Sequence, residues 1–208
     1  KIGFHFFSKI KTKDLNSKNY VIYYLQKNPE ATVDVKGMYY SDQLNNIINI
    51  WKILPKDFML VVKEHPNCIG DRSILFYKNF LKLRNTCIIK NSDLLQENKN
   101  EKFIKNSLAT FSIASTASLQ SSLNKVPSFT FAETFFSCLK YSSKLSLEDL
   151  RNSKNLENLI KKKLNDSDKN NNFYLENSFE GYIVDEYLND QINLGKIQAA
   201  ILEVMSEK

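Results

Sequence analysis

Along this chain, short apolar segments alternate with segments of helical periodicity. The first, Tyr20–Leu25, is uncharged and consists of β-branched, aromatic and aliphatic residues, which is typical of a strand buried on both faces. Four similar segments follow. The predicted strands are Tyr20–Leu25, Phe58–Val62, Thr86–Ile89, Ala109–Ile113 and Ser128–Phe131. Strands that alternate with helices predict an α/β fold, in which a parallel sheet of about five strands carries helices on both faces.

The helical segments are predicted from apolar residues spaced three or four positions apart. The clearest begins at Ser41 and Asp42, which can cap a helix, and runs to about Leu54, just before Pro55. The remaining helices and helical turns are predicted over residues 74–83, 103–106, 115–123, 145–164, 182–188 and 192–205. The stretch Gln26–Ser41, between the first strand and the first helix, is expected to be a long loop.

This pattern divides the chain into three parts. Residues 1–19 are expected to be a linker or the tail of an upstream domain, because they contain many lysines and the chain does not begin with Met. Residues 20–144 form the α/β core. Residues 145–208 are expected to be closing helices of the same domain, which makes the C-terminal tail helical.

Composition excludes several classes of protein. There are 29 Lys and Arg against 23 Asp and Glu, so the net charge of +6 is small and spread over 208 residues, which is weak evidence for nucleic-acid binding. Only 5 glycines are present, which argues against a Gly-rich phosphate loop. The three cysteines form no C-x-x-C pair, so no zinc site is expected, and their number fits a reducing compartment. No apolar run is long enough for a membrane span.

Polar residues follow each predicted strand, at the edge where ligands bind in open α/β sheets. His65 follows the second strand and precedes Pro66, which restricts its backbone. Its imidazole could donate to a phosphate oxygen or act as an acid on a leaving group. The alternative is a histidine that packs in a turn and bonds a backbone carbonyl. The other histidine, His5, is expected to be structural or exposed.

The segment Ser115-Thr116-Ala117-Ser118 follows the fourth strand and opens a predicted helix. Free N–H groups in the first turn of a helix, together with hydroxyl side chains, can bind an anion. The alternative is that Ser115 or Thr116 simply caps its own helix.

Other polar residues at the same edge are further candidates for binding. Glu30 and Glu64 could each act as a base, bind a ribose hydroxyl or be solvated. Lys63 could balance a phosphate or pair with Glu64, and Asn91 follows the third strand. No pair of carboxylates suggests a site for a divalent metal.

Three of these segments together resemble the capsule polysaccharide biosynthesis protein family. The first combines Pro29-Glu30-Ala31-Thr32, Gly37 and Asp42-Gln43, and the second is Lys63-Glu64-His65-Pro66, followed by Gly70 and Tyr77. The third, from Ser115 to Pro127, is similar to a Gly-Thr-Ala-Gly-x-Glu-Ala segment of that family. The resemblance covers about Tyr20 to Phe131.

The resemblance implies the Rossmann-like C-terminal domain of a GT-B glycosyltransferase, with a His-Pro motif like that of bacterial sialyltransferases and Kdo transferases, which use CMP-activated sugars. It implies that His65 is catalytic and meets the donor phosphate, and that Ser115 and Thr116 complete the phosphate site. This sequence departs from the family at Ser115, Ser118 and Gln120, where the family has two glycines and a Glu that often bonds a ribose.

The predicted function is therefore the nucleotide-sugar-binding half, CMP-sugar in particular, of a metal-independent glycosyltransferase that builds a bacterial capsule or surface polysaccharide. No cofactor is expected, and this piece alone is expected to be inactive. An acceptor polysaccharide or glycolipid would bind through the missing N-terminal domain, in the cytoplasm or at the inner face of the inner membrane. Two alternatives remain: a non-catalytic nucleotide- or carbohydrate-binding module in an assembly complex, and a basic domain that binds nucleic acid.

Overall fold

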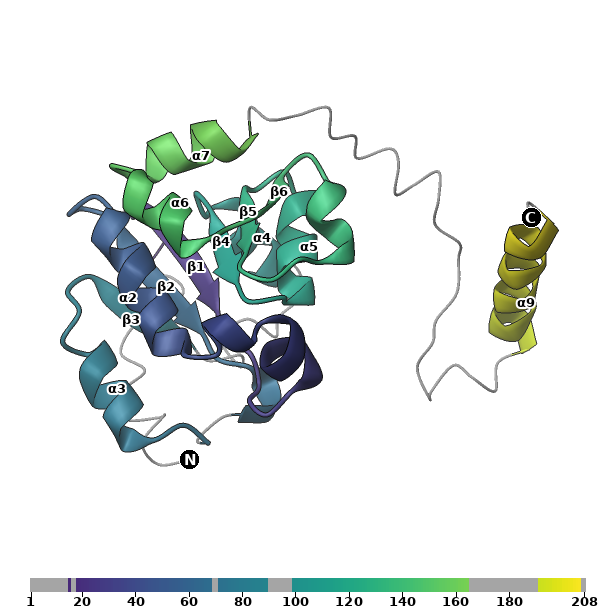
Figure 1. Cartoon of the computed structure of the whole chain (residues 1–208), viewed down its shortest axis with the longest axis horizontal. Coiled ribbons are helices and arrows are strands. Elements are labelled where there is room, and N and C mark those ends of the chain that lie inside the picture. The colour runs from purple at the N-terminus through teal and green to yellow at the C-terminus, as the bar shows by residue number, and fades with distance from the viewer. Residues whose placement is uncertain (1–14, 16–17, 69–70, 90–98, 165–190, 207–208) are drawn as a thin grey trace. The chain divides into compact units, whose positions relative to one another are not determined.

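A computed structural model describes residues 15, 18–68, 71–89, 99–164 and 191–206 of the chain. The chain separates into two compact units, Lys1–Asn170 and Asn171–Lys208. The first unit holds an α/β sheet domain, and the second holds helix α9, Gln191–Ser206 (Figure 1). Within the described residues, none of the helices is both long enough and apolar enough to cross a membrane.

The sheet of the first unit has six strands, all parallel, in the order β3-β2-β1-β4-β5-β6 (Figure 1). The strands are β1 Tyr20–Tyr24, β2 Met59–Lys63, β3 Thr86–Ile89, β4 Thr110–Ser112, β5 Ser128–Thr130 and β6 Ser142–Lys144. The predicted parallel sheet and the first five strands are thus confirmed, with ends that differ by one or two residues. The structure adds a sixth strand, β6, a short edge strand of polar residues that has no apolar signal in the sequence.

Helices cover both faces of the sheet, as the alternation of elements predicts. On one face, Val21, Tyr23 and Phe111 belong to a core that also contains residues of α2 (Gln43–Ile53), α3 (Ile74–Phe80), α6 (Leu147–Asn152) and α7 (Leu156–Leu164). On the other face, Tyr20 and Ile22 pack with Phe103 of α4 (Lys99–Lys105) and Ala117 of α5 (Thr116–Leu123). Leu15, in the segment expected to be a linker, is 3% exposed and joins this second core.

Local capping decides where several helices begin. Asp42 accepts a hydrogen bond from the backbone N–H of Asn45 and so caps α2, as predicted. The single helix predicted over 145–164 is wrong, because the structure has α6 and α7 there. Ser146 caps α6, and Asn155 accepts from the N–H of Asn158 and starts α7. α6 ends at Asn152 with Ser153 as its C-cap, and Asn155 then begins a separate helix.

The other predicted helices differ mainly at their ends. The helix at 74–83 stops at Phe80, the helical turn at 103–106 is the longer helix α4, and the helix at 192–205 is α9. The expected loop over 26–41 contains two short helical turns, η2 (Thr32–Lys36) and η3 (Met38–Tyr40). The predicted helix at 182–188 lies outside the described residues.

The loop after β1 packs against the end of β4. Val33, Ile113 and Ala132 form a small buried cluster there, and a Cβ atom at Gly37 would lie 2.3 Å from Cγ2 of Ile113. The absence of a side chain at Gly37 therefore lets η2 and η3 approach the carboxyl end of β4 closely.

The start of α6 gives the domain a pH-sensitive contact. Burial by itself would raise the pKa of Asp149, but hydrogen bonds from Lys163 and from the backbone and side chain of Ser146, with the charge of Lys163, lower it to about 2. A carboxylate whose pKa is lower in the folded than in the unfolded state stabilises the fold above the unfolded pKa, and loses that effect as the pH falls through the folded value.

We expect Asp149→Asn to lower the free energy of unfolding by about 2 kcal/mol at pH 7. Between about pH 4 and pH 2 the difference between variant and wild type should shrink, because protonation removes the same interaction from the wild type. Urea unfolding at a series of pH values measures both quantities. A difference that is the same at pH 2 and pH 7 would show that the Asp149 charge does not contribute.

Candidate functional site

The register of the three central strands brings their carboxyl ends to one level. Tyr23 of β1 pairs with Val62 of β2 on one side and with Phe111 of β4 on the other. The strand order changes direction between β1 and β4, and ligands bind at such a point in open α/β sheets. We call this side of the sheet the carboxyl edge. The segments that follow β2 and β4 begin at this edge, on either side of β1. Because β2 and β4 are two strand spacings apart, these segments begin about 10 Å from each other.

Gln26, directly after β1, is a structural centre of the carboxyl edge. Its backbone N–H donates to Oε1 of Gln43 (2.8 Å), and Nε2 of Gln43 donates back to its carbonyl (2.9 Å). Its side-chain Oε1 accepts from the N–H of Ala114 (2.6 Å). Both glutamines are 4% exposed, so their amides are used internally. Gln26 thereby joins the end of β1 to the start of α2 and to the turn between β4 and α5.

Glu64 is held in a buried ion pair with Arg72. Its carboxylate is therefore not free to act as a base. Nε of Arg72 donates to Oε2 (2.7 Å) and Nη2 donates to Oε1 (3.0 Å), while the N–H of His65 also donates to Oε1 (2.9 Å). Nη2 of Arg72 also donates to the carbonyl of Gln26 (2.9 Å). The pair therefore fixes the β2 end relative to β1. Arg72 was missed by the sequence analysis, because it is eight residues from Glu64 in no recognisable motif.

His65 lies partly exposed beyond β2, in a turn that its own ring supports. The backbone N–H of Asn67 donates to Nδ1 (3.2 Å), and the N–H of Cys68 donates to the carbonyl of His65 (3.0 Å). Because Nδ1 accepts, the proton of the neutral imidazole is on Nε2. The ring can therefore donate one hydrogen bond from Nε2 while its orientation is fixed through Nδ1.

The hydroxyl segment after β4 divides into capping, buried and exposed groups. Ser115 caps α5 and accepts from the N–H of Ala117 (3.2 Å), so the capping interpretation is confirmed for this residue. Ser118 is fully buried and its Oγ bonds Oγ of Ser112 (2.7 Å), which makes it a structural residue. Thr116 is exposed at the first position of the helix. Capping does not exclude anion binding, because the helix start still has its dipole.

Asn100, which was not among the predicted site residues, links Lys63 and Gln120 by hydrogen bonds. Nζ of Lys63 donates to Oδ1 of Asn100 in α4 (3.0 Å), and Nδ2 of Asn100 donates to Oε1 of Gln120 in α5 (3.4 Å). The expected alternative of a Lys63–Glu64 pair is therefore wrong, since Glu64 is bound by Arg72. Burial lowers the pKa of Lys63.

The remaining predicted residues are less informative. Glu30 is exposed, and its backbone N–H donates to Oδ2 of Asp34 (2.8 Å), so it stabilises the start of the η2 turn. Asn91 lies outside the described residues.

Two hollows open at the carboxyl edge. One, of about 220 Å³, lies beside the Glu64–Arg72 pair and is lined by Asn28, Cys68, Asp71, Arg72, Ser73 and Phe76. The other, of about 490 Å³, lies at the ends of β5 and β6. It is lined by Glu133, Thr134, Phe135, Ser137, Ser143, Lys144 and Lys163. Arg72 lines the first hollow. It is seven residues after His65 in the sequence. That His65, Ser115 and Thr116 surround one cavity stays a prediction.

No protein-family model matches the chain, and no curated protein sequence matches it. Several solved structures are similar. KpsC, a beta Kdo 2,7 transferase from Thermosulfurimonas dismutans, is 14% identical with a TM-score of 0.46, over 71% of this chain and 47% of that one. The UDP-GlcNAc 2-epimerase from Methanocaldococcus jannaschii is 16% identical with a TM-score of 0.49, over 80% and 42%. MnaA from S. aureus, solved with UDP, is 12% identical with a TM-score of 0.42, over 75% and 39%. This chain thus aligns with less than half the length of each of these proteins.

Proposed function

We propose that this chain is the nucleotide-sugar-binding half of a GT-B glycosyltransferase that takes part in making a bacterial surface polysaccharide. The observation that carries the proposal is the placement of two segments at one edge of the sheet. The Lys63–Pro66 segment leaves β2 and the capped start of α5 leaves β4, on either side of β1. These are two of the three segments that carry the resemblance described above.

The two segments offer complementary groups for a diphosphate or a phosphodiester. His65 has a donor at Nε2 and a ring fixed through Nδ1, and the start of α5 has the positive end of a helix dipole. A phosphate between them would receive a hydrogen bond from one side and a favourable electrostatic field from the other. In sugar transfer, the same groups would stabilise the charge that develops on the leaving phosphate.

For the donor, the resemblance to enzymes with a His-Pro motif favours a CMP-activated sugar. The acceptor saccharide or glycolipid would bind mainly through a second domain. The buried Glu64–Arg72 pair is compatible with this division, because both carboxylate oxygens of Glu64 already accept hydrogen bonds from Arg72.

A thermal-shift screen of the chain against CMP, UDP, GDP and ADP tests the proposal. A nucleotide present at about a hundred times its Kd stabilises the folded state by roughly 2.7 kcal/mol, which is on the order of 5–10 °C in Tm for a domain of this size. We expect CMP to give the largest shift. A larger shift with UDP would correct the donor but support nucleotide binding, whereas no shift with any of the four would contradict the proposed function.

The second candidate is a non-catalytic nucleotide- or carbohydrate-binding module. It is favoured by Gln120, which stands where the resembling family has a ribose-binding Glu and whose Oε1 accepts a hydrogen bond from Asn100 instead. Incubation of the chain with a CMP-sugar tests whether this chain alone holds a catalytic site. Slow release of CMP by hydrolysis, lost in His65→Ala, would contradict the module, whereas tight binding without release is expected both of the module and of an isolated donor half.

A further inference from the structure

A third hollow lies at the amino edge of the sheet, the side at which the strands begin. It has a volume of about 520 Å³, within the range of small-molecule sites. Phe58 precedes β2, Asn85 precedes β3, and Trp51 comes from the last turn of α2. The lining residues are Trp51, Lys52, Leu54, Pro55, Lys56, Phe58, Arg84 and Asn85. We call this hollow the amino-edge pocket. It is separate from the proposed nucleotide site, because the two lie at opposite ends of the strands.

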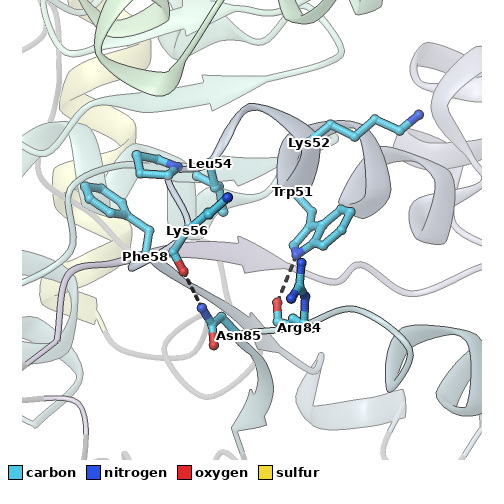
Figure 2. Close-up of a pocket in the computed structure, with 8 residues that line it drawn as sticks. Trp51, Lys52, Leu54, Lys56, Phe58, Arg84 and Asn85 are labelled. Atoms are coloured by element: carbon cyan, nitrogen blue, oxygen red, sulfur yellow. Dashed lines mark hydrogen bonds between the residues drawn. The ribbon is translucent and has the colours of Figure 1, made fainter.

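Hydrogen bonds between distant segments hold the pocket open. Nε1 of Trp51 donates to the carbonyl of Arg84 (2.9 Å), and Nδ2 of Asn85 donates to the carbonyl of Lys56 (2.5 Å); Figure 2 shows both as dashed lines. Asn85 has a φ of 54°, and its carbonyl accepts from the N–H of Leu60 in β2 (2.9 Å). Asparagine tolerates this left-handed conformation better than most residues. The walls are therefore positioned by the fold before any ligand arrives.

The lining combines an apolar surface with positive charge. Trp51, Leu54, Pro55 and Phe58 supply the apolar part, and none of the lining residues is acidic. No ion pair is recorded for Lys52, Lys56 or Arg84 among the residues that the structure describes. Lys52 extends away from the other side chains in Figure 2 and belongs to the last turn of α2, where it offsets the negative end of the helix dipole. Lys56 and Arg84 therefore provide the charge in the pocket.

The hydrogen-bonding groups of the pocket favour an acceptor-rich ligand. The carbonyls of Lys56 and Arg84 already accept from Asn85 and Trp51, so they are less available to donors on a ligand. The ammonium of Lys56 and the guanidinium of Arg84 are donors only. A phosphate or carboxylate accepts from both, and an attached apolar or aromatic group would cover the indole and phenyl rings.

From this chemistry we propose that the amino-edge pocket binds an amphiphilic organic anion, a phosphate or carboxylate joined to an apolar or aromatic body. Such a ligand would neutralise Lys56 and Arg84 and bury the exposed faces of Trp51 and Phe58. The anionic group belongs either to a soluble molecule or to the headgroup of a membrane lipid. The proposal does not depend on nucleotide binding at the carboxyl edge.

Trp51 allows a direct test, because it is the single tryptophan of the 208-residue chain. Its fluorescence, excited at a wavelength that the probes do not absorb, is titrated with phenyl phosphate, phenol and inorganic phosphate. We expect saturable binding of phenyl phosphate, with binding of phenol and of inorganic phosphate each weaker by about tenfold or more, because each lacks one of the two contacts. No saturable change with phenyl phosphate, or equal affinity for phenol or for inorganic phosphate, would overturn the proposal.

A matched pair of double variants tests the assigned side chains. Lys56→Gln with Arg84→Gln removes two charges from the pocket, and Lys36→Gln with Lys102→Gln removes two exposed charges from η2 and α4. All four positions are exposed, so both variants should fold, which their Tm checks. We expect the first to bind phenyl phosphate about five- to tenfold more weakly and the second to bind it like the wild type. Equal losses in the two variants would reduce the effect to net charge and overturn the proposal.

Sedimentation with lipid vesicles identifies the source of the anionic group. Vesicles of phosphatidylcholine with and without phosphatidylglycerol are compared for the wild type and both double variants. Binding to the anionic vesicles that is lost only in the pocket variant supports the proposal, with a lipid headgroup as ligand. Phenyl phosphate binding without vesicle binding supports it with a soluble ligand. Vesicle binding alone, equal in both variants and without binding of phenyl phosphate, contradicts it.

Discussion

Arg72→Met is expected to lower the free energy of unfolding by about 3–5 kcal/mol, the range for removing one partner of a buried ion pair. The Glu64 side chain is 1% exposed and would keep only the N–H of His65 as a recorded donor. The carbonyl of Gln26 would also lose the hydrogen bond from Nη2. Met retains an unbranched, apolar side chain against Phe76, over which the guanidinium lies at 5.4 Å. The loss therefore reports on charge and hydrogen bonding more than on packing.

Two controls make this result interpretable in urea unfolding experiments. Arg72→Met combined with Glu64→Gln should recover part of the lost stability, since the uncompensated charge is then absent. Lys105→Met breaks the exposed pair with Glu101, whose side chains are 54% and 48% exposed, and should change stability by less than about 0.5 kcal/mol. If Arg72→Met lies within about 1 kcal/mol of the wild type, the Glu64–Arg72 pair does not hold the carboxyl edge together.

His65→Ala is expected to reduce nucleotide affinity roughly ten- to a hundredfold, which corresponds to about 1.5–3 kcal/mol for a charge-assisted hydrogen bond. Stability should fall by about 1 kcal/mol or less, because His65 is partly exposed and its ring accepts only one recorded hydrogen bond, from the N–H of Asn67. Calorimetric titration with the nucleotide that gives the largest thermal shift measures the first quantity, and urea unfolding of the same preparation measures the second.

Ser115→Ala is the matched variant on the other side of the site. The backbone N–H groups of the helix start survive this substitution, so binding should weaken less than in His65→Ala. Loss of the cap should cost about 1 kcal/mol of stability. His65→Gln keeps a side-chain donor and should restore part of the affinity. If Ser115→Ala abolishes binding while His65→Ala leaves it unchanged, the phosphate has been assigned to the wrong segment.

The class of the fold, and the edge of the sheet at which the His65 and Ser115 segments lie, could be predicted from the sequence alone. A buried parallel strand such as Tyr20–Tyr24 is a local run of apolar residues, and a helix start such as Asp42 or Ser115 is a side chain bonded to a backbone N–H two or three residues away. Both signals are contained in a few consecutive positions. Because parallel strands end at a common edge, the placement of the His65 and Ser115 segments on that edge also followed.

The roles of the residues at this edge depend on contacts between elements that are distant in the sequence. Three hydrogen-bonded pairs at this edge join residues far apart in the sequence. Glu64 and Arg72 are 8 positions apart, Gln26 and Gln43 are 17 apart, and Lys63 and Asn100 are 37 apart. No local pattern encodes such pairs, because their distance in space depends on how separate elements pack. The edge strand β6 also depends on a contact that no local pattern encodes. Ser142–Lys144 has no apolar run, and it is a strand because it pairs with β5. The amino-edge pocket arises in the same way, from α2 and the turns before β2 and β3, which meet only once the sheet has formed.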